Sequence, residues 1–128
     1  MELKVFVVED FPNMRILLSD LFQSIGRIQL VGSADTEAEA RLWLDEHQGE
    51  WDVAIVDLVL NQGSGFGVVS HANGRQDPGK VVVLSSFATP GVRKHCMSLG
   101  AAAVFDKGDT VLFSRWMNEQ ASRLAPAA

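Results

Sequence analysis

Side chains able to carry out chemistry follow the apolar runs of this 128-residue sequence. Four of the strand-length apolar runs are followed, at once or within two residues, by an acid, a hydroxyl or an amine. These residues are Glu9 and Asp10 after residues 3–8, Asp57 after residues 53–56, Ser85 after residues 80–84 and Lys107 just past residues 102–105. What they can do together depends on whether the fold brings the ends of these runs to one place.

A shared crevice would give these residue types a specific chemistry. Three carboxylates repel one another unless a cation lies between them. Carboxylate oxygens, completed by a backbone carbonyl and waters, are the ligands that Mg²⁺ prefers. Lys107 offers a point charge to a phosphate and Ser85 a hydroxyl donor. An aspartate facing that assembly, Asp57, can attack phosphorus and form an aspartyl-phosphate, and the metal would neutralise the phosphate oxygens.

The elements that must position these residues follow from apolar periodicity. Five apolar runs of strand length alternate with segments in which apolar residues recur at helical spacing. The predicted strands are residues 3–8, 28–31, 53–56, 80–84 and 102–105. Residues typical of helix ends support the helices between the strands. Pro12 suits the first turn of a helix, Gly26 suits a helix end, and Thr36 with Glu39 fits a capping box. The remaining predicted landmarks are a helix from about residue 66 to 73–74, a turn at 77–79, a fourth helix ended by Gly100 and a last helix over 112–124.

Continuous apolar strands joined by helices predict an α/β fold. The expected architecture is a doubly wound five-stranded parallel sheet in the flavodoxin-like order 2-1-3-4-5, with helices on both faces. In such sheets ligands bind outside the carboxyl ends of the strands, where the winding reverses. That rule places the polar residues of the strand ends in one crevice. We expect one domain over residues 1–124 and a short tail at 125–128, leaving no separate output module.

Composition excludes several other classes of protein. The formal net charge of −5 and the pI of about 5.0 leave no general basic surface for nucleic acid. No apolar run approaches the ~20 residues that span a bilayer, and the amino terminus lacks the pattern of a secretory signal. A single cysteine, Cys96, suits a reducing compartment. The expected location is the cytoplasm, without direct nucleic-acid or membrane binding.

Motifs in a fixed order carry a family resemblance. They are Glu9-Asp10, the block 57–60 with Gly63-Ser64-Gly65, Ser85 after an apolar strand, and residues 99–101 leading to Asp106-Lys107. Over about residues 3–124 the chain resembles the receiver domains of bacterial two-component response regulators, including the stand-alone chemotaxis type. A receiver accepts a phosphoryl group from a sensor histidine kinase or a phosphotransfer protein. It then signals to a downstream protein or forms a homodimer.

The resemblance assigns roles to individual residues. Asp57 would be the phosphoryl acceptor, with Asp10, Glu9 and the backbone carbonyl of Val59 completing the protein's Mg²⁺ ligands. The other carried-over roles are Lys107 pairing with the phosphoryl group, Ser85 moving toward it, Ser86 bordering it and Phe105 at the aromatic switch position. Such a domain phosphorylates and dephosphorylates itself and is not a multiple-turnover enzyme in the ordinary sense.

Two departures from the family pattern concern the output surface. Receivers usually carry proline after the lysine, whereas this chain has Gly108, which removes a rigid feature. Phe105 lacks the hydroxyl of the commoner tyrosine, so a switch there would work by packing. Neither departure removes a group needed for the chemistry.

Other readings of the same residues stay open. Taken singly, Glu9 and Asp10 are ordinary surface acids, Asp57 an N-cap or loop acid, and Phe105 plain core packing. A receiver-like interaction module that is never phosphorylated is the main alternative function. A phosphatase of the haloacid dehalogenase type is disfavoured, because it needs a second acid where this chain has Val59.

Overall fold

Five parallel strands form the centre of the computed structural model, which describes residues 1–74 and 78–124. Their order in the sheet is β2-β1-β3-β4-β5, as the sequence predicted. The strands are β1 (Leu3–Val8), β2 (Ile28–Ala34), β3 (Val53–Val56), β4 (Lys80–Ser85) and β5 (Ala103–Asp106). Their order reverses between β1 and β3, so a crevice is expected at the carboxyl ends of these two strands.

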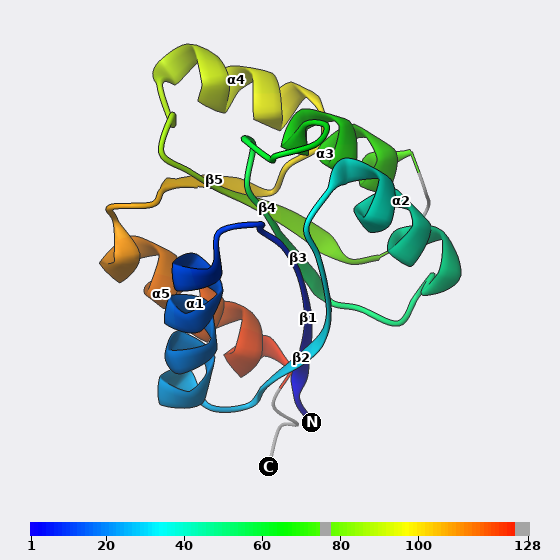
Figure 1. Cartoon of the computed structure of the whole chain (residues 1–128). Coiled ribbons are helices and arrows are strands. Elements are labelled where there is room, and N and C mark those ends of the chain that lie inside the picture. The colour runs from blue at the N-terminus through cyan, green and yellow to red at the C-terminus, as the bar shows by residue number, and fades with distance from the viewer. Residues whose placement is uncertain (75–77, 125–128) are drawn as a thin grey trace.

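Helices cover both faces of the sheet, as Figure 1 shows. They are α1 (Pro12–Ile25), α2 (Glu37–Glu46), α3 (Gly65–Asn73), α4 (Pro90–Ser98) and α5 (Thr110–Arg123). The first and last lie on one face, and the other three lie on the opposite face. Within the described ranges, no helix is both long and apolar enough to cross a membrane.

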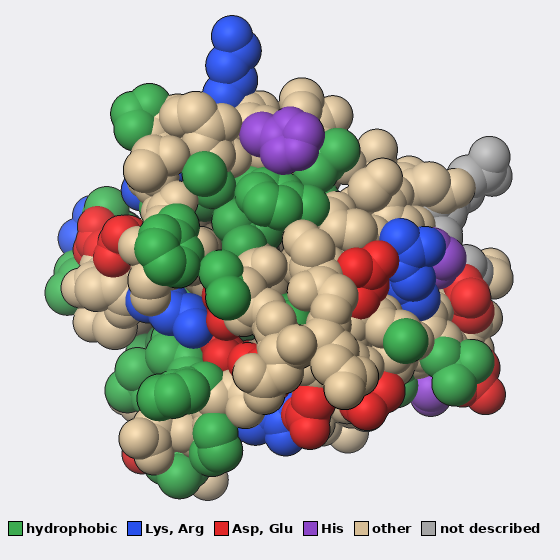
Figure 2. Space-filling view, turned by 45° about the horizontal axis from the view of Figure 1, so that its top comes forward, with side chains coloured by type: hydrophobic (Ala, Val, Ile, Leu, Met, Phe, Trp, Pro, Cys, Tyr) green, Lys and Arg blue, Asp and Glu red, His purple; other side chains and the backbone are tan. Residues whose placement is uncertain are grey.

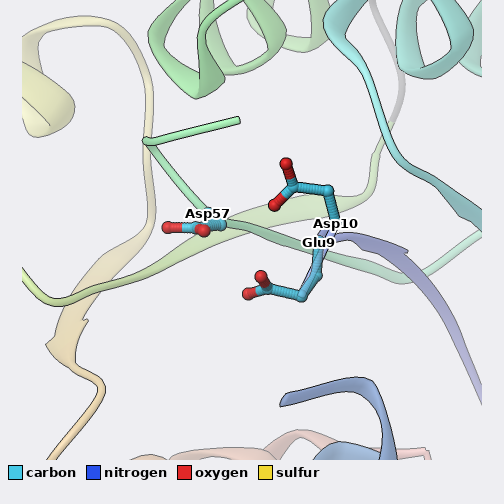
Figure 3. A group of neighbouring side chains, drawn as sticks. All are labelled: Glu9, Asp10 and Asp57. Atoms are coloured by element: carbon cyan, nitrogen blue, oxygen red, sulfur yellow. The ribbon is translucent and has the colours of Figure 1, made fainter. Parts of the chain in front are cut away.

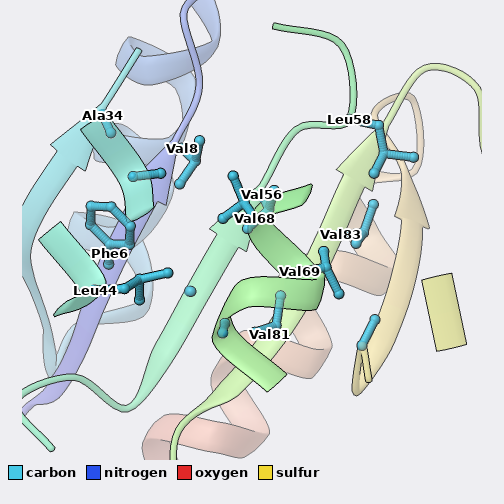
Figure 4. Close-up of a cluster of buried hydrophobic side chains, with 14 of the residues drawn as sticks. Phe6, Val8, Ala34, Leu44, Val56, Leu58, Val68, Val69, Val81 and Val83 are labelled. Atoms are coloured by element: carbon cyan, nitrogen blue, oxygen red, sulfur yellow. The ribbon is translucent and has the colours of Figure 1, made fainter. Parts of the chain in front are cut away.

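Alternation along the strands divides the core into two layers. On β1, Val5 and Val7 face α1 and α5, whereas Phe6 and Val8 face α2, α3 and α4. The same alternation runs through β3 and β4, because successive side chains of a strand point to opposite faces. Figure 4 shows the second of these layers, with Leu44 of α2 and Val68 and Val69 of α3 packed on the strands. A sheet buried on both faces holds the strand ends in fixed positions.

Side-chain caps start several helices at the edge of the sheet where the strands end. Thr36, Thr89 and Asp109 each accept a hydrogen bond from the backbone N–H three residues on. The predicted capping box is only half formed. Thr36 accepts from the Glu39 N–H at 3.1 Å, but the Glu39 carboxylate accepts from the Asp35 N–H at 3.2 Å rather than from that of Thr36.

The structure moves some predicted boundaries. β2 extends to Ala34 instead of ending at residue 31, because it pairs with the whole length of β1 across a register irregularity between Val5 and Phe6. β4 includes Ser85, and β5 runs one residue later than predicted, from Ala103 to Asp106. Two sequence predictions, Asp77 of the turn at 77–79 and the tail at 125–128, fall outside the described residues.

Candidate functional site

Three carboxylates converge where β1 and β3 end. Glu9 and Asp10 follow β1, Asp57 follows β3, and one oxygen of each lies within 4.8 Å of the others. Figure 3 shows the side chains projecting from the two adjacent strand ends. Backbone hydrogen bonds fix their places: the Glu9 N–H donates to Ala34 O at 3.1 Å and the Asp57 N–H donates to Val8 O at 3.0 Å. The cluster therefore lies in the crevice that the strand order predicts.

Lys107 joins two of these carboxylates. Its Nζ lies 3.0 Å from Glu9 Oε2 and 3.1 Å from Asp57 Oδ2. The Lys107 N–H donates to Ser85 O at 3.0 Å, which ties the turn after β5 to the end of β4. Burial alone would lower the pKa of this amine, but the hydrogen bonds and charges of Glu9 and Asp57 outweigh burial and raise it. Lys107 therefore stays charged at neutral pH.

Glu9 is the most deeply placed of the acids. It is 2% exposed, and burial raises the pKa of its carboxyl, with the neighbouring Asp57 charge adding to the rise and Lys107 opposing it. The Phe11 N–H donates to Glu9 Oε1 at 3.1 Å. A buried acid beside a second acid is costly to ionise unless positive charge compensates it.

The donor set fits a hard divalent cation. When all three acids are ionised, their charges and that of Lys107 leave two negative charges uncompensated. Oxygen ligands from carboxylates are the type that Mg²⁺ takes, usually with waters in its remaining positions. The residues present therefore suit Mg²⁺. Within residues 1–74 and 78–124, these three acids form the one group of three or more Asp, Glu, His or Cys side chains whose ligand atoms lie close enough together to hold a metal ion.

A cavity of about 300 Å³ opens over the cluster. Its lining combines the acids and Lys107 with exposed apolar side chains and the loops after β3 and β4. The lining residues are Asp10, Phe11, Asp57, Val59, Leu60, Asn61, Ser86, Phe87 and Lys107. Figure 2 shows acidic and basic side chains meeting on this face, with hydrophobic side chains on both sides. The cavity is large enough for a phosphoryl group beside the carboxylates.

Ser85 and Ser86 lie differently with respect to the cavity. Ser85 is fully buried, and its hydroxyl accepts from the Phe87 N–H at 3.0 Å. Ser86, not Ser85, lines the cavity. The Ser85 hydroxyl is thus engaged with its own loop, and a contact with the phosphoryl group would require the loop to move.

Val59 lines the cavity, whereas Phe105 packs away from it against α5. Val59 is 58% exposed at the mouth of the cavity, and its N–H donates to Asp57 Oδ1 at 3.4 Å. Phe105 is half-buried, with its ring centroid 5.8 Å from that of Phe113 and 6.2 Å from that of Trp116. Phe105 therefore packs on α5 in this structure.

Gly108 has a local role that proline could not fill. Its N–H donates to Asp106 Oδ1 at 2.8 Å, and a proline has no N–H to donate. The aspartate of the Asp106-Lys107 pair thus closes the turn that presents Lys107.

Several site residues were not among the sequence candidates. Phe11 and Phe87 line the cavity although 58% and 60% exposed, and the Asn61 N–H donates to Asp10 Oδ2 at 2.6 Å. An exposed aromatic residue directly after a strand-end motif was the available signal for Phe11. The Asn61 contact uses only backbone, so its side-chain type gave no signal.

The chain matches known proteins in both sequence and fold. The family model of the response regulator receiver domain matches residues 5–111. The receiver domain of NarL from Mycobacterium tuberculosis is 24% identical, with a TM-score of 0.83 over 94% of this chain and 97% of that one. The response regulator domain of Thermotoga maritima CheB is 22% identical, with a TM-score of 0.80 over 98% of this chain and all of that one. CheY in a complex with CheX, beryllofluoride and Mg²⁺ from Borrelia burgdorferi is 19% identical, with a TM-score of 0.80 over 90% of this chain and 87% of the matched chain. A search of curated proteins gave no significant match.

Proposed function

The chain belongs to the family of response regulator receiver domains of two-component systems, and we propose that it is a signalling switch that accepts a phosphoryl group on Asp57. The observation that carries the proposal is the position of the Asp57 carboxylate. It lies beside two further acids and the Lys107 ammonium, and together with Asp10 and Lys107 it lines one open cavity. An interaction surface alone would not need a partly buried ammonium held between two acids.

The proposed step is a displacement at phosphorus. An oxygen of Asp57 forms the new bond to phosphorus as the bond to the donor breaks, and the donor leaves with the electron pair. The donor is a phosphorylated histidine of a kinase or a phosphotransfer protein, or a small acyl phosphate. Lys107 would move its ammonium from the Asp57 oxygen to an oxygen of the incoming phosphoryl group.

Mg²⁺ is the proposed cofactor of this step. Asp10, Asp57, the backbone carbonyl of Val59 and Glu9, directly or through water, would hold it. When bound, Mg²⁺ supplies positive charge to the phosphoryl oxygens. Asp10 is oriented for this role by the Asn61 N–H, which takes up one of its oxygens at 2.6 Å.

The proposed output runs through Ser85 and Phe105. Phosphorylation adds about 1.5 to 2 negative charges, judged from other phosphorylated side chains. The Ser85 hydroxyl would give up its contact with the Phe87 N–H and turn to the phosphoryl group, drawing the loop before α4 inward. Phe105 would then move into the vacated space and change the surface of α4, β5 and α5. We propose that a downstream protein or a second copy of the domain reads this surface, in the cytoplasm.

Intact mass tests the acceptor. We expect acetyl phosphate with Mg²⁺ to add the mass of one phosphoryl group to the wild type and none to D57N, whose near-isosteric amide cannot be phosphorylated. The matched control is D20N, which changes an exposed aspartate on α1. Excess EDTA should stop the labelling. Equal adduct on D57N, or unchanged labelling in EDTA, would overturn the acceptor or the metal role.

Hydrogen exchange tests the output. Beryllofluoride with Mg²⁺, a mimic of the phosphoryl group, should change amide protection between Thr89 and Leu112 as well as around Asp57. Changes confined to residues touching Asp57 would show that the surface of α4, β5 and α5 carries no signal. The interaction module that needs no phosphorylation would then be the better account.

A further inference from the structure

Glu37, an acid outside the cluster, is linked to it through the backbone of the loop after β3. Glu37, the first residue of α2, lies under the loop of residues 58–64 that connects β3 to α3. Its Oε1 accepts from the Ser64 N–H at 2.8 Å, and its own N–H donates to Gln62 O at 3.2 Å. Glu37 therefore holds two residues of this loop, one through its side chain and one through its backbone.

The Glu37 carboxylate is itself fixed. Arg41, one turn along α2, bonds Glu37 Oε2 through both Nε and Nη2 at 2.8 Å. The Ser64 N–H above all, and then Arg41, lower the pKa of Glu37 against the effect of burial, so the side chain stays ionised. An anion is also favourable at this position, because the first turn of α3 follows Ser64.

Two glycines make room for this carboxylate. Gly63 has a φ of +81°, which side-chain-bearing residues rarely adopt, and a Cβ there would overlap the Cβ of Glu37. A Cβ at Gly67, in the first turn of α3, would overlap the Glu37 carboxyl group. The loop and the first turn of α3 are thus shaped around this one side chain.

The same loop donates hydrogen bonds to two acids of the cluster. Ser64 forms an isolated antiparallel bridge with Val59, and the Val59 N–H donates to Asp57 Oδ1. In the middle of the loop, the Asn61 N–H donates to Asp10 Oδ2. A displacement of the loop at Ser64 is therefore passed to the Val59 backbone and to two carboxylates of the cluster.

We propose that Glu37 is a positioning residue for phosphoryl transfer, which fixes the loop of residues 58–64 so that Val59, Asp57 and Asp10 keep the geometry that binds Mg²⁺. The inference rests on the proposed function, and it assigns to α2 a role in the site although α2 contributes no residue to the cavity. Groups that orient metal ligands typically change metal affinity by about 10- to 100-fold when removed.

The test compares three variants of the whole chain. E37M removes the acceptor of the Ser64 N–H and keeps side-chain length, whereas E37Q keeps an oxygen acceptor. The matched control is E39M, since Glu39 also lies in the first turn of α2 but its carboxylate accepts from the Asp35 N–H, away from the loop of residues 58–64. Titration calorimetry with Mg²⁺ alone measures affinity, intact mass with acetyl phosphate measures the labelling rate at low and saturating Mg²⁺, and thermal unfolding measures stability.

We expect E37M to bind Mg²⁺ about 10-fold or more weakly and to label slowly at low Mg²⁺, with the rate recovering as Mg²⁺ saturates. E37Q should retain most of the affinity, and E39M should bind Mg²⁺ as the wild type does even if its melting temperature falls. Any other pattern overturns the inference, including wild-type affinity in E37M or an equal loss in E37M and E39M. Failure of the wild type to bind Mg²⁺ or to label would instead overturn the proposed function.

Discussion

At the scale of single residues, Lys107 decides how the acids coexist. Its ammonium lies within 3.1 Å of both Glu9 and Asp57, so it offsets their repulsion. The same ammonium lies next to the cavity into which a phosphoryl group would come. One side chain can thus serve as a counter-ion before transfer and as a phosphate ligand after it.

Replacing Lys107 by methionine should slow phosphorylation. K107M keeps the length of the side chain but removes the charge that would meet the phosphoryl oxygens. Removal of one hydrogen-bond donor that stabilises the transition state in other enzymes slows the reaction by roughly 10²- to 10³-fold, and we expect a similar fall in the labelling rate. The measurement is the rate of adduct formation at saturating Mg²⁺. A rate equal to that of the wild type would show that the ammonium takes no part in transfer.

Asp10 gives a separate prediction about the metal. D10N removes one negative charge but keeps an oxygen that can accept from the Asn61 N–H. Mg²⁺ affinity should fall by about 10-fold or more, which is about 1.4 kcal/mol or more. Calorimetry with Mg²⁺ checks this, with D20N as the exposed control. Identical affinities of D10N and D20N would remove Asp10 from the metal site.

At the scale of elements, the site depends on loops as much as on strand ends. β1 and β3 place the acids, but the contacts that orient Asp10 and Asp57 come from backbone N–H groups of the loop after β3. That loop is anchored on α2 through Glu37. A loop tied at both ends holds a ligand geometry that a free loop would not.

The contribution of the Glu37 carboxylate to the free energy of unfolding should depend on pH, and the lowered pKa of Glu37 fixes the direction of this dependence. The pKa of Glu37 is lowered from its ordinary 4.5, chiefly by the Ser64 N–H, so its ionised form stabilises the folded chain. That contribution is present above pH 4.5 and is lost as the pH falls through the lower folded-state pKa. The difference in free energy of unfolding between wild type and E37Q should therefore shrink on acidification. Urea unfolding at neutral and acidic pH measures it, and a constant difference would contradict the assignment.

The positions of the strands were predictable from the sequence, whereas the contact between Glu37 and the loop of residues 58–64 was not. Continuous apolar runs ending in acids are a local signal, and the crevice rule turned them into a shared site. Glu37 looked like one first-turn acid among others, because its partner Ser64 is 27 residues away. The resemblance placed Ser86 beside the expected site, and Ser86 lines the cavity. The bond between the Ser85 hydroxyl and the Phe87 N–H depends on the conformation of the loop after β4, which strand periodicity does not encode.

At the scale of the whole molecule, two core layers support the sheet from opposite sides. Phe113 and Met117 of α5 fill one layer, and Leu44 of α2 helps fill the other. The strands that carry the acids lie between the layers and belong to both. Stability should therefore be sensitive to either layer, while the chemistry should depend on the strand ends and on the loop contacts that orient their side chains.

A pair of substitutions in α2 tests the packing of one of these layers. Leu44 is fully buried, whereas Leu42 in the same helix is 60% exposed. L44A should lower the free energy of unfolding by about 2–5 kcal/mol, and L42A should change it by less than about 0.5 kcal/mol. Chemical denaturation measures both. Equal losses would mean that α2 does not pack as described.

The whole-molecule arrangement was the most predictable level. The strand order, the two helical layers and the crevice all follow from alternating apolar segments and right-handed crossovers. The stack of Trp43 on the buried Phe6, with ring centroids 4.0 Å apart, does not follow from these rules. The geometry of this stack depends on how α2 packs against β1, and no local sequence pattern determines that packing.

The most direct test of the central claim is to locate the phosphoryl group. The protein would be treated with acetyl phosphate and Mg²⁺ and then with borohydride, which reduces an acyl phosphate to the alcohol and releases phosphate. Peptide mass spectrometry then finds the changed residue. The account predicts conversion of Asp57, and of no other acid, to homoserine. Conversion at Glu9, Asp10 or another acid, or no conversion when Mg²⁺ is present, would contradict it.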